Sequence, residues 1–135
     1  MSNVPEGFEA IFRSSPFLDL LGPIYNRKTE KGLIFGLRAE DKHCNARELV
    51  HGGVFSSLAD IALGYNAAFS GDDPVPIVTA SLTIDYAGSA KLGEWIEIET
   101  DVQKVGRKMA FANCYFIVSS KRIARASGVF TVISA

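Results

Sequence analysis

The segment that most constrains the fold runs from Gly52 to Gly71, which is apolar or small on every side. Large apolar side chains recur at helical spacing, and small residues fill most of the positions between them. Asp60 is the only charged residue in the segment. A helix without a polar face is buried rather than lying on a surface. The segment therefore predicts a central helix that the rest of the chain encloses.

Alternating patterns predict strands around this helix. One alternating segment precedes it, and four follow it, joined by short turns that favour antiparallel neighbours. The predicted strands are 31–39, 78–86, 94–102, 108–118 and 122–133. An antiparallel sheet wrapped around one buried helix, an α+β fold, is the simplest packing of these parts. Strands 78–86 and 108–118 carry more apolar residues than one sheet face buries, which predicts that a second chain covers the surplus.

The rest of the chain gives weaker patterns. Residues 4–15 predict a short amphipathic helix, which Pro16 limits because the residue before a proline avoids helical angles. Residues 17–26 are apolar up to a glycine-proline break. Residues 40–50 are polar and irregular, so they predict a loop.

Composition excludes several classes of protein. A chain of 135 residues with 47% hydrophobic and 21% charged residues predicts one globular domain spanning residues 1–135. A formal net charge of −1 gives no reason to expect nucleic-acid binding. We expect no signal peptide and no membrane span, and therefore a cytoplasmic protein. Cys44 and Cys114 form no disulfide framework and fit no metal-ligand spacing.

Asp60 is the residue whose chemistry the pattern does not explain. An ionised carboxylate in a buried helix costs several kcal/mol unless it is paired or hydrogen-bonded, on the order of the penalty known for buried charges. Asp60 either reaches a structural partner across an interface, or it borders a cleft and acts as a general base or nucleophile. The residues alone leave both readings open.

The residues before the helix, from Asn45 through His51-Gly52-Gly53, offer a second candidate. Two glycines at a helix start let a ligand approach free backbone N–H groups, and the helix dipole favours negative charge there. That arrangement suits an oxyanion hole for acyl transfer. A plain loop-to-helix turn is the alternative explanation.

Helix geometry separates these two candidates. Nine residues of helix between His51 and Asp60 give a rise of roughly 13 Å and a rotation of about 180°. The two side chains cannot reach one small reacting group within a single chain. If they cooperate, a two-fold dimer must bring the His51-Gly52 end of one chain to the Asp60 of another.

Taken together, these motifs resemble a known family. The segment Asn45…His51-Gly52-Gly53…Asp60, followed by the stretches 85–93 and 106–111, is similar to hotdog-fold acyl-CoA thioesterases. The similarity is closest to the phenylacetate-degradation (PaaI-type) branch, which is related to 4-hydroxybenzoyl-CoA thioesterases, and it covers the chain from about residue 30. Related sequences often have proline where this chain has Ser89.

The resemblance implies a role for each matching residue. Asp60 matches the carboxylate that acts on the thioester as general base or nucleophile, and the Gly52 N–H matches the donor that polarises its carbonyl. Asn45 matches a loop amide near the thioester carbonyl or the attacking water. His51 matches a histidine that supports the geometry of the site. Thr79 matches a residue whose hydroxyl holds the water. The family's sites lie between subunits, and its dimers often pair into tetramers.

Coenzyme A carries phosphates, so basic residues should border the site. The substrate-binding residues predicted from these motifs are Gly53, Tyr86, Gly88, Ser89, Lys91, Arg107 and Lys108. We expect hydrolysis of acyl-CoA to free acid and coenzyme A by a homodimer or homotetramer, with no cofactor and no metal. A hotdog hydratase or dehydratase and a non-catalytic acyl-CoA binder are the alternatives. Aryl and medium aliphatic acyl groups are both plausible substrates.

Overall fold

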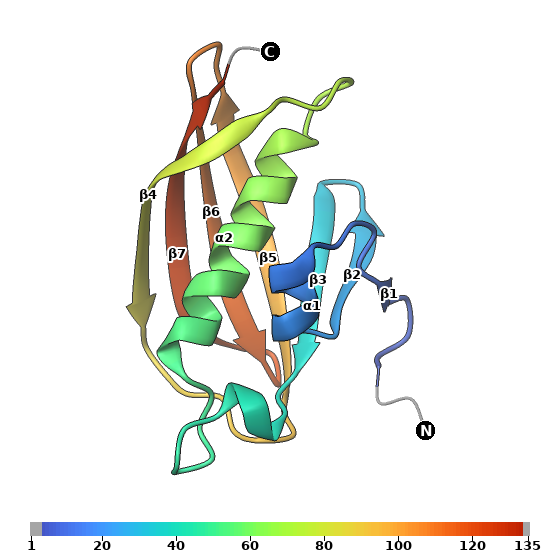
Figure 1. Cartoon of the computed structure of the whole chain (residues 1–135), viewed down its shortest axis with the longest axis vertical. Helices are drawn as coiled ribbons and strands as arrows, with labels where there is room; N and C mark the ends of the chain where they lie inside the picture. The colour runs from blue at the N-terminus through green and yellow to red at the C-terminus, as the bar shows by residue number, and fades with distance from the viewer. Residues whose placement is uncertain (1–3, 134–135) are drawn as a thin grey trace.

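The computed structural model describes residues 4–133 and shows one sheet and one long helix (Figure 1). The elements in chain order are β1 (Glu9–Ala10), α1 (Pro16–Leu21), β2 (Ile24–Thr29), β3 (Gly32–Arg38), the short 3-10 helix η1 (Asp41–His43), α2 (Gly52–Ala68), β4 (Ile77–Tyr86), β5 (Trp95–Val105), β6 (Met109–Val118) and β7 (Lys121–Val132). Within the described residues, neither α-helix is both long and apolar enough to cross a membrane.

The strands form a seven-stranded antiparallel sheet in the order β1-β2-β3-β5-β6-β7-β4. This arrangement leaves β4 at one edge of the sheet and β1 at the other. Helix α2 lies across one face of the sheet (Figure 1). The structure confirms the predicted α+β architecture, an antiparallel sheet around a central helix.

Helix α2 supplies much of the core. Its largest buried side chains, Phe55, Leu58 and Leu63, are at most 2% exposed, and Ala59, Ala62 and Ala67 are fully buried. These residues pack on the inward-facing side chains of the sheet, among them the buried aromatic rings of β3, β6 and β7. The small residues let the helix lie close to the strands, so the fold follows from the pattern of the central segment.

The predicted helix over residues 4–15 is wrong: the chain there forms a turn, the short strand β1 and a bend. The Ile11 N–H donates to the Ile24 carbonyl, and the Phe12 N–H donates to the Asn26 side chain at 2.8 Å. The helix instead begins at Pro16, because the Ser15 hydroxyl accepts from the Leu18 N–H and proline is tolerated in the first helical turn. Pro16 therefore starts a helix where the sequence analysis expected it to end one.

Two further elements have no clear sequence signal. Strand β2 reads IYNRKT, which is polar after its first two residues, and it forms because it pairs along its whole length with β3. The 3-10 helix η1 lies in the predicted loop and is closed by a capping box between Glu40 and His43. Neither element depends on a local periodic pattern, so periodicity does not reveal it.

Strand β4 contains an irregularity that strict alternation misses. Thr79 pairs with Phe130 and Ser81 pairs with Val129, so Ala80 is an extra residue in the ladder. A bulge of this kind reverses the facing of the residues on one side of it. Strict alternation would put Thr79 and Leu82 on opposite faces of the strand, whereas the structure places Thr79 against α2.

Candidate active site

Asp60 lies on the wall of a large cleft formed by the described residues. The cleft has a volume of about 1020 Å³ and is bounded by α2, by the start of β4 and by the segment around α1. Asp60 is half-buried rather than enclosed. Asp60 therefore borders a space that can hold a ligand, as its interpretation as a general base or nucleophile requires.

Thr79 is the hydrogen-bond partner of this carboxylate. The Thr79 hydroxyl donates to Asp60 Oδ1 at 2.5 Å, across the gap between β4 and α2. The extra residue Ala80 turns Thr79 toward the helix, so the bulge in β4 creates this contact. One carboxylate oxygen is thereby held in place, while Oδ2 has no hydrogen bond to any described residue.

The start of α2 presents a backbone donor, as the two glycines predict. The His51 imidazole caps the helix by accepting from the Gly53 N–H at 3.0 Å. No described residue accepts a hydrogen bond from the Gly52 N–H. His51 thus uses the second glycine's amide and leaves that of the first available to a ligand.

Asn45 organises the loop that leads into this helix start. Its side-chain oxygen accepts from the Arg47 N–H at 2.9 Å and from the Leu49 N–H at 3.2 Å. The amide nitrogen of the same side chain makes no hydrogen bond to a described residue. Asn45 can therefore shape the loop with its oxygen and offer its NH₂ group to a ligand.

The loop that leads into α2 and the stretch 85–93 lie side by side at this end of the molecule. The Val50 N–H donates to the Ala90 carbonyl at 2.8 Å, the Leu92 N–H donates to the Glu48 carbonyl at 3.0 Å, and Leu49 forms a bridge with Lys91. Gly88 is anchored near the start of β7 by a bond from its N–H to the Ile123 carbonyl. The stretch around Ser89 and Lys91 therefore flanks the start of α2.

Tyr86 links the end of β4 to the start of α2. Its hydroxyl donates to the Gly52 carbonyl at 2.7 Å, and a Cβ added at Gly52 would lie 3.2 Å from that hydroxyl. The Tyr86 ring also packs edge-to-face on Phe55. Tyr86 thus lies next to the Gly52 N–H, the candidate donor, and its hydrogen bond to the Gly52 carbonyl supports the start of α2.

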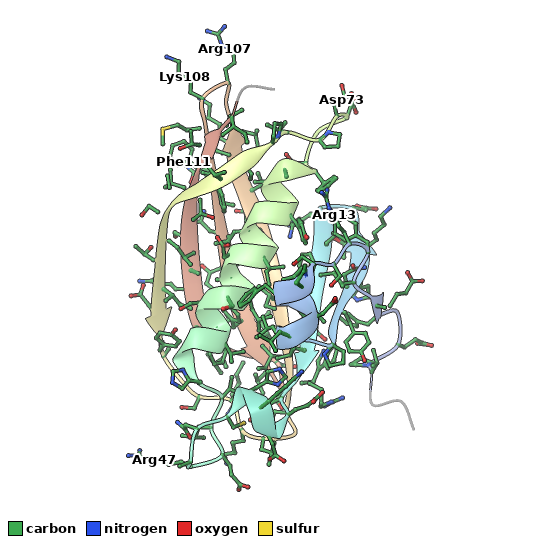
Figure 2. The ribbon with its side chains drawn as sticks, in the orientation of Figure 1. Arg13, Arg47, Asp73, Arg107, Lys108 and Phe111 are labelled. Carbon is green, nitrogen blue, oxygen red and sulfur yellow. The ribbon has the colours of Figure 1, made fainter. Side chains whose placement is uncertain are left out.

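The predicted basic residues lie at two opposite ends of the folded molecule, with Lys91 beside the loop that leads into α2. Figure 2 shows Arg107 and Lys108 at the end opposite Arg47, whose loop leads into α2. Within one chain the structure therefore does not bring Arg107 and Lys108 to Gly52. Arg47, two residues after Asn45, is a cation on the loop that leads into α2 and was not among the predicted basic residues.

No metal site is apparent in the region. His43 is buried, its Nδ1 accepts from the Glu40 N–H at 2.9 Å, and its Nε2 contacts the Leu21 carbonyl. Both ring nitrogens are therefore engaged in the fold. Among residues 4–133, no group of three His, Cys, Asp or Glu side chains is placed to hold a metal ion.

Burial, with Asp41 and Glu48 nearby, raises the pKa of the Cys44 thiol, which disfavours the thiolate that nucleophilic attack requires.

A free helix-start amide can polarise a carbonyl, and a carboxylate on a cleft wall can act as a base or nucleophile, so the two groups suit acyl transfer. Comparison with known proteins identifies the family. The model of the Thioesterase superfamily matches residues 48–123, which is more than half of the chain. The chain belongs to the thioesterase superfamily.

Individual relatives agree with this assignment. The chain is 49% identical over 131 residues to a Pseudomonas aeruginosa protein named "Putative esterase PA0474", covering 96% of this chain and 98% of that protein. It is 31% identical over 109 residues to human acyl-coenzyme A thioesterase 13, covering 80% of this chain and 77% of the human protein. The structure of the E. coli PaaI protein matches with a TM-score of 0.80 at 20% identity, covering 90% of this chain and 86% of that one.

These findings confirm the resemblance, the hotdog fold and the enzyme class: the protein is a thioester hydrolase. The roles predicted for individual residues, and the need for a second chain, stay predictions.

Proposed function

We propose that this protein hydrolyses acyl-CoA thioesters at a site that two protomers share, with Asp60 from one and the Gly52 N–H from the other. The observation that carries the proposal is the hydrogen bond from Thr79 to Asp60 at 2.5 Å, on the wall of a cleft of about 1020 Å³. The human relative named as an acyl-coenzyme A thioesterase supports coenzyme A esters as the substrate class.

The separation of Asp60 and Gly52 along α2 supports a shared site. Eight residues of helix correspond to a rise of about 12 Å, too far for both groups to reach one carbonyl. Gly52 does not line the cleft that contains Asp60. A second chain is therefore required if the amide and the carboxylate act on one thioester.

Strand β4 offers the means of bringing the two groups together. It is an edge strand of the sheet, and its Val78 and Tyr86 side chains are 49% and 48% exposed. Thr79 near its start contacts Asp60, and Tyr86 at its end contacts Gly52. If two β4 strands pair antiparallel about Leu82, Thr79 of each faces Asp85 of the other, next to Tyr86. Two identical sites per dimer follow from this symmetry.

The proposed reaction uses each group for one task. The Gly52 N–H donates to the carbonyl oxygen, where negative charge develops as the tetrahedral intermediate forms. Asp60 either takes a proton from water as the water attacks the carbonyl carbon, or attacks that carbon itself to form an anhydride that water then opens. In both routes the C–S bond breaks, coenzyme A leaves as thiolate and takes up a proton, and the acyl group leaves as free acid.

Free thiol released from a panel of acyl-CoA esters tests the proposal. We expect Asp60→Asn to lower kcat by at least about 100-fold, because that is the scale of a positioned base. Asp101→Asn is the matched control, since it neutralises an exposed carboxylate on β5, and it should keep the wild-type rate. A wild-type rate for Asp60→Asn contradicts the proposal, as does hydration of an enoyl-CoA ester without thiol release.

Labelled water tests for the anhydride. A single turnover in water enriched in oxygen-18 places label in Asp60 if an anhydride forms and water opens it at the Asp60 carbonyl. Direct attack by water on the thioester, and opening of an anhydride at the acyl carbonyl, both leave Asp60 unlabelled with the label only in the released acid, so label in Asp60 is the result that demonstrates the anhydride. Mass spectrometry of the peptide that contains Asp60 reads the outcome.

A further inference from the structure

Gly64 occupies a position in the cleft that no predicted role explains. It follows Asp60 by four residues on α2, and both line the cleft. Residues four apart lie on the same face of a helix. Gly64 therefore borders the space directly beyond the carboxylate, on the side toward the C-terminal end of α2.

Neither the backbone nor the packing of the protomer requires glycine here. Gly64 is not among the residues with positive φ. A Cβ added to it would meet only the Phe130 ring, at 3.6 and 4.0 Å, which is ordinary contact. At Gly128, by contrast, an added Cβ would lie 2.9 Å from Phe130 and 3.0 Å from Leu63, so packing does require that glycine. Glycine is unfavourable inside a helix compared with alanine, so its presence at position 64 calls for another explanation.

The shape of the cleft explains why position 64 is a glycine. Beyond Gly64 its walls are mostly apolar: Tyr65 and Ala68 come from α2, Phe69 follows the helix, and Pro74 and Pro76 come from the segment before β4. From Asp60 to Ala68 the helix rises about 12 Å, so this part of the cleft is longer than a short acyl group needs. A side chain at position 64 would project into its beginning.

The aromatic wall of the cleft is held in place from behind. The Phe12 ring packs edge-to-face on Tyr65 and Phe69, with ring centroids 5.2 and 5.5 Å apart. Contacts of this geometry fix the orientation of both rings. The width of the cleft at Gly64 therefore depends on residue 64 itself more than on movement of the neighbouring rings of Tyr65 and Phe69.

We infer that Gly64 determines acyl specificity, and that the substrate carries an apolar acyl group that extends along α2 past Gly64 toward Ala68. This inference rests on the proposed function, because it assigns the acyl group to the side of Asp60 where the cleft continues. The glycine leaves room for the second and later carbons of the chain next to the reacting carbonyl. The acyl group is thus longer than acetyl, and its carbons next to the reacting carbonyl are apolar.

Substitution at position 64 tests the inference through selectivity. We expect the wild-type protein to prefer decanoyl-CoA to acetyl-CoA, and Gly64→Leu to lower kcat/KM for decanoyl-CoA at least about tenfold while changing that for acetyl-CoA by less than about twofold. Gly64→Ala should give an intermediate loss. Gly71→Leu is the matched control, because a Cβ at Gly71 meets nothing within 4 Å and Gly71 does not line the cleft. It should keep the wild-type profile.

Binding measurements separate this inference from the hydrolase proposal. In the Asp60→Asn background, calorimetry should show decanoyl-CoA binding more tightly than coenzyme A, and addition of Gly64→Leu should remove that difference. If no thioester is hydrolysed but this binding pattern is observed, the proposed hydrolysis is wrong and the acyl-binding site at Gly64 is supported. Equal losses on both substrates, an unchanged profile, or a changed oligomeric state in Gly64→Ala would overturn the inference, since the glycine would then serve folding or subunit packing.

Discussion

The Gly52 N–H is a candidate catalytic group that a single substitution can remove. Proline at the first position of a helix removes the N–H and keeps the helix, provided that the preceding residue is extended. His51 meets this condition, with φ −65° and ψ 140°. We expect Gly52→Pro to lower kcat for acyl-CoA hydrolysis by about 100-fold, the usual scale for one oxyanion-hole donor.

Gly52→Ala is the control for this deletion. Both variants add a Cβ near the Tyr86 hydroxyl, but alanine keeps the N–H. The alanine variant should therefore retain most of the thiol-release activity while the proline variant loses it. Equal activities in the two variants would show that the amide does not polarise the thioester.

Cys114 provides a test of burial that is independent of catalysis. Burial raises the pKa of its thiol to about 12, from an ordinary value of 9.0. Because the folded state holds the proton more tightly than the unfolded state, the contribution of Cys114 to stability is complete below pH ~9 and declines as the pH rises toward the folded-state value. The free energy of unfolding in urea, measured against pH, should therefore fall more steeply for wild type than for Cys114→Ala. Parallel curves would show that the thiol is not protected.

Thr79 marks the limit of sequence reasoning about single residues. The family resemblance singled out its hydroxyl, whereas strict alternation along strand 78–86 puts Thr79 on the face opposite Leu82. The bulge at Ala80 resolves this conflict by bringing Thr79 to Asp60. Nothing in a polar-apolar pattern identifies which residue of a strand is the extra one, so this contact could not be derived from periodicity.

At the scale of elements, the N-terminal cap of α2 has a measurable role. The His51 side chain accepts from the Gly53 N–H, and loss of a helix cap costs about 1 kcal/mol. We expect His51→Ala to lower the free energy of unfolding by that amount and to reduce hydrolysis less than Asp60→Asn does. Urea unfolding and thiol release measure the two effects. If activity falls as far as in Asp60→Asn while stability is unchanged, His51 takes a direct part in the chemistry.

Elements whose patterns arise from burial were predicted well. Helix α2 spans Gly52–Ala68 against a predicted end at Gly71, and the later strands lie within three residues of their expected ends. The N-terminal third was predicted poorly, because Pro16 marks a helix start as readily as a helix end and β2 is defined by its neighbour β3. Burial is recorded in local periodicity, whereas pairing of a polar strand is not.

At the scale of the whole molecule, the sequence predicted the separation of the candidate groups better than their surroundings. The spacing of His51 and Asp60 alone required a second chain for any joint action, and the structure places Gly52 outside the cleft that contains Asp60. The cleft itself was not predictable, because its walls come from α1, α2 and the segment before β4, which are far apart in the sequence.

Mixing two inactive variants tests the shared site directly. A heterodimer of Asp60→Asn and Gly52→Pro has one site with both defects and one site with an intact Asp60 and an intact Gly52 N–H. When equal amounts are unfolded together and refolded, half of the dimers are heterodimers, so symmetry predicts recovery of about a quarter of the wild-type activity. Each variant refolded alone is the control and should stay inactive. A site contained within one chain would give no recovery, because every protomer would then keep its own defect.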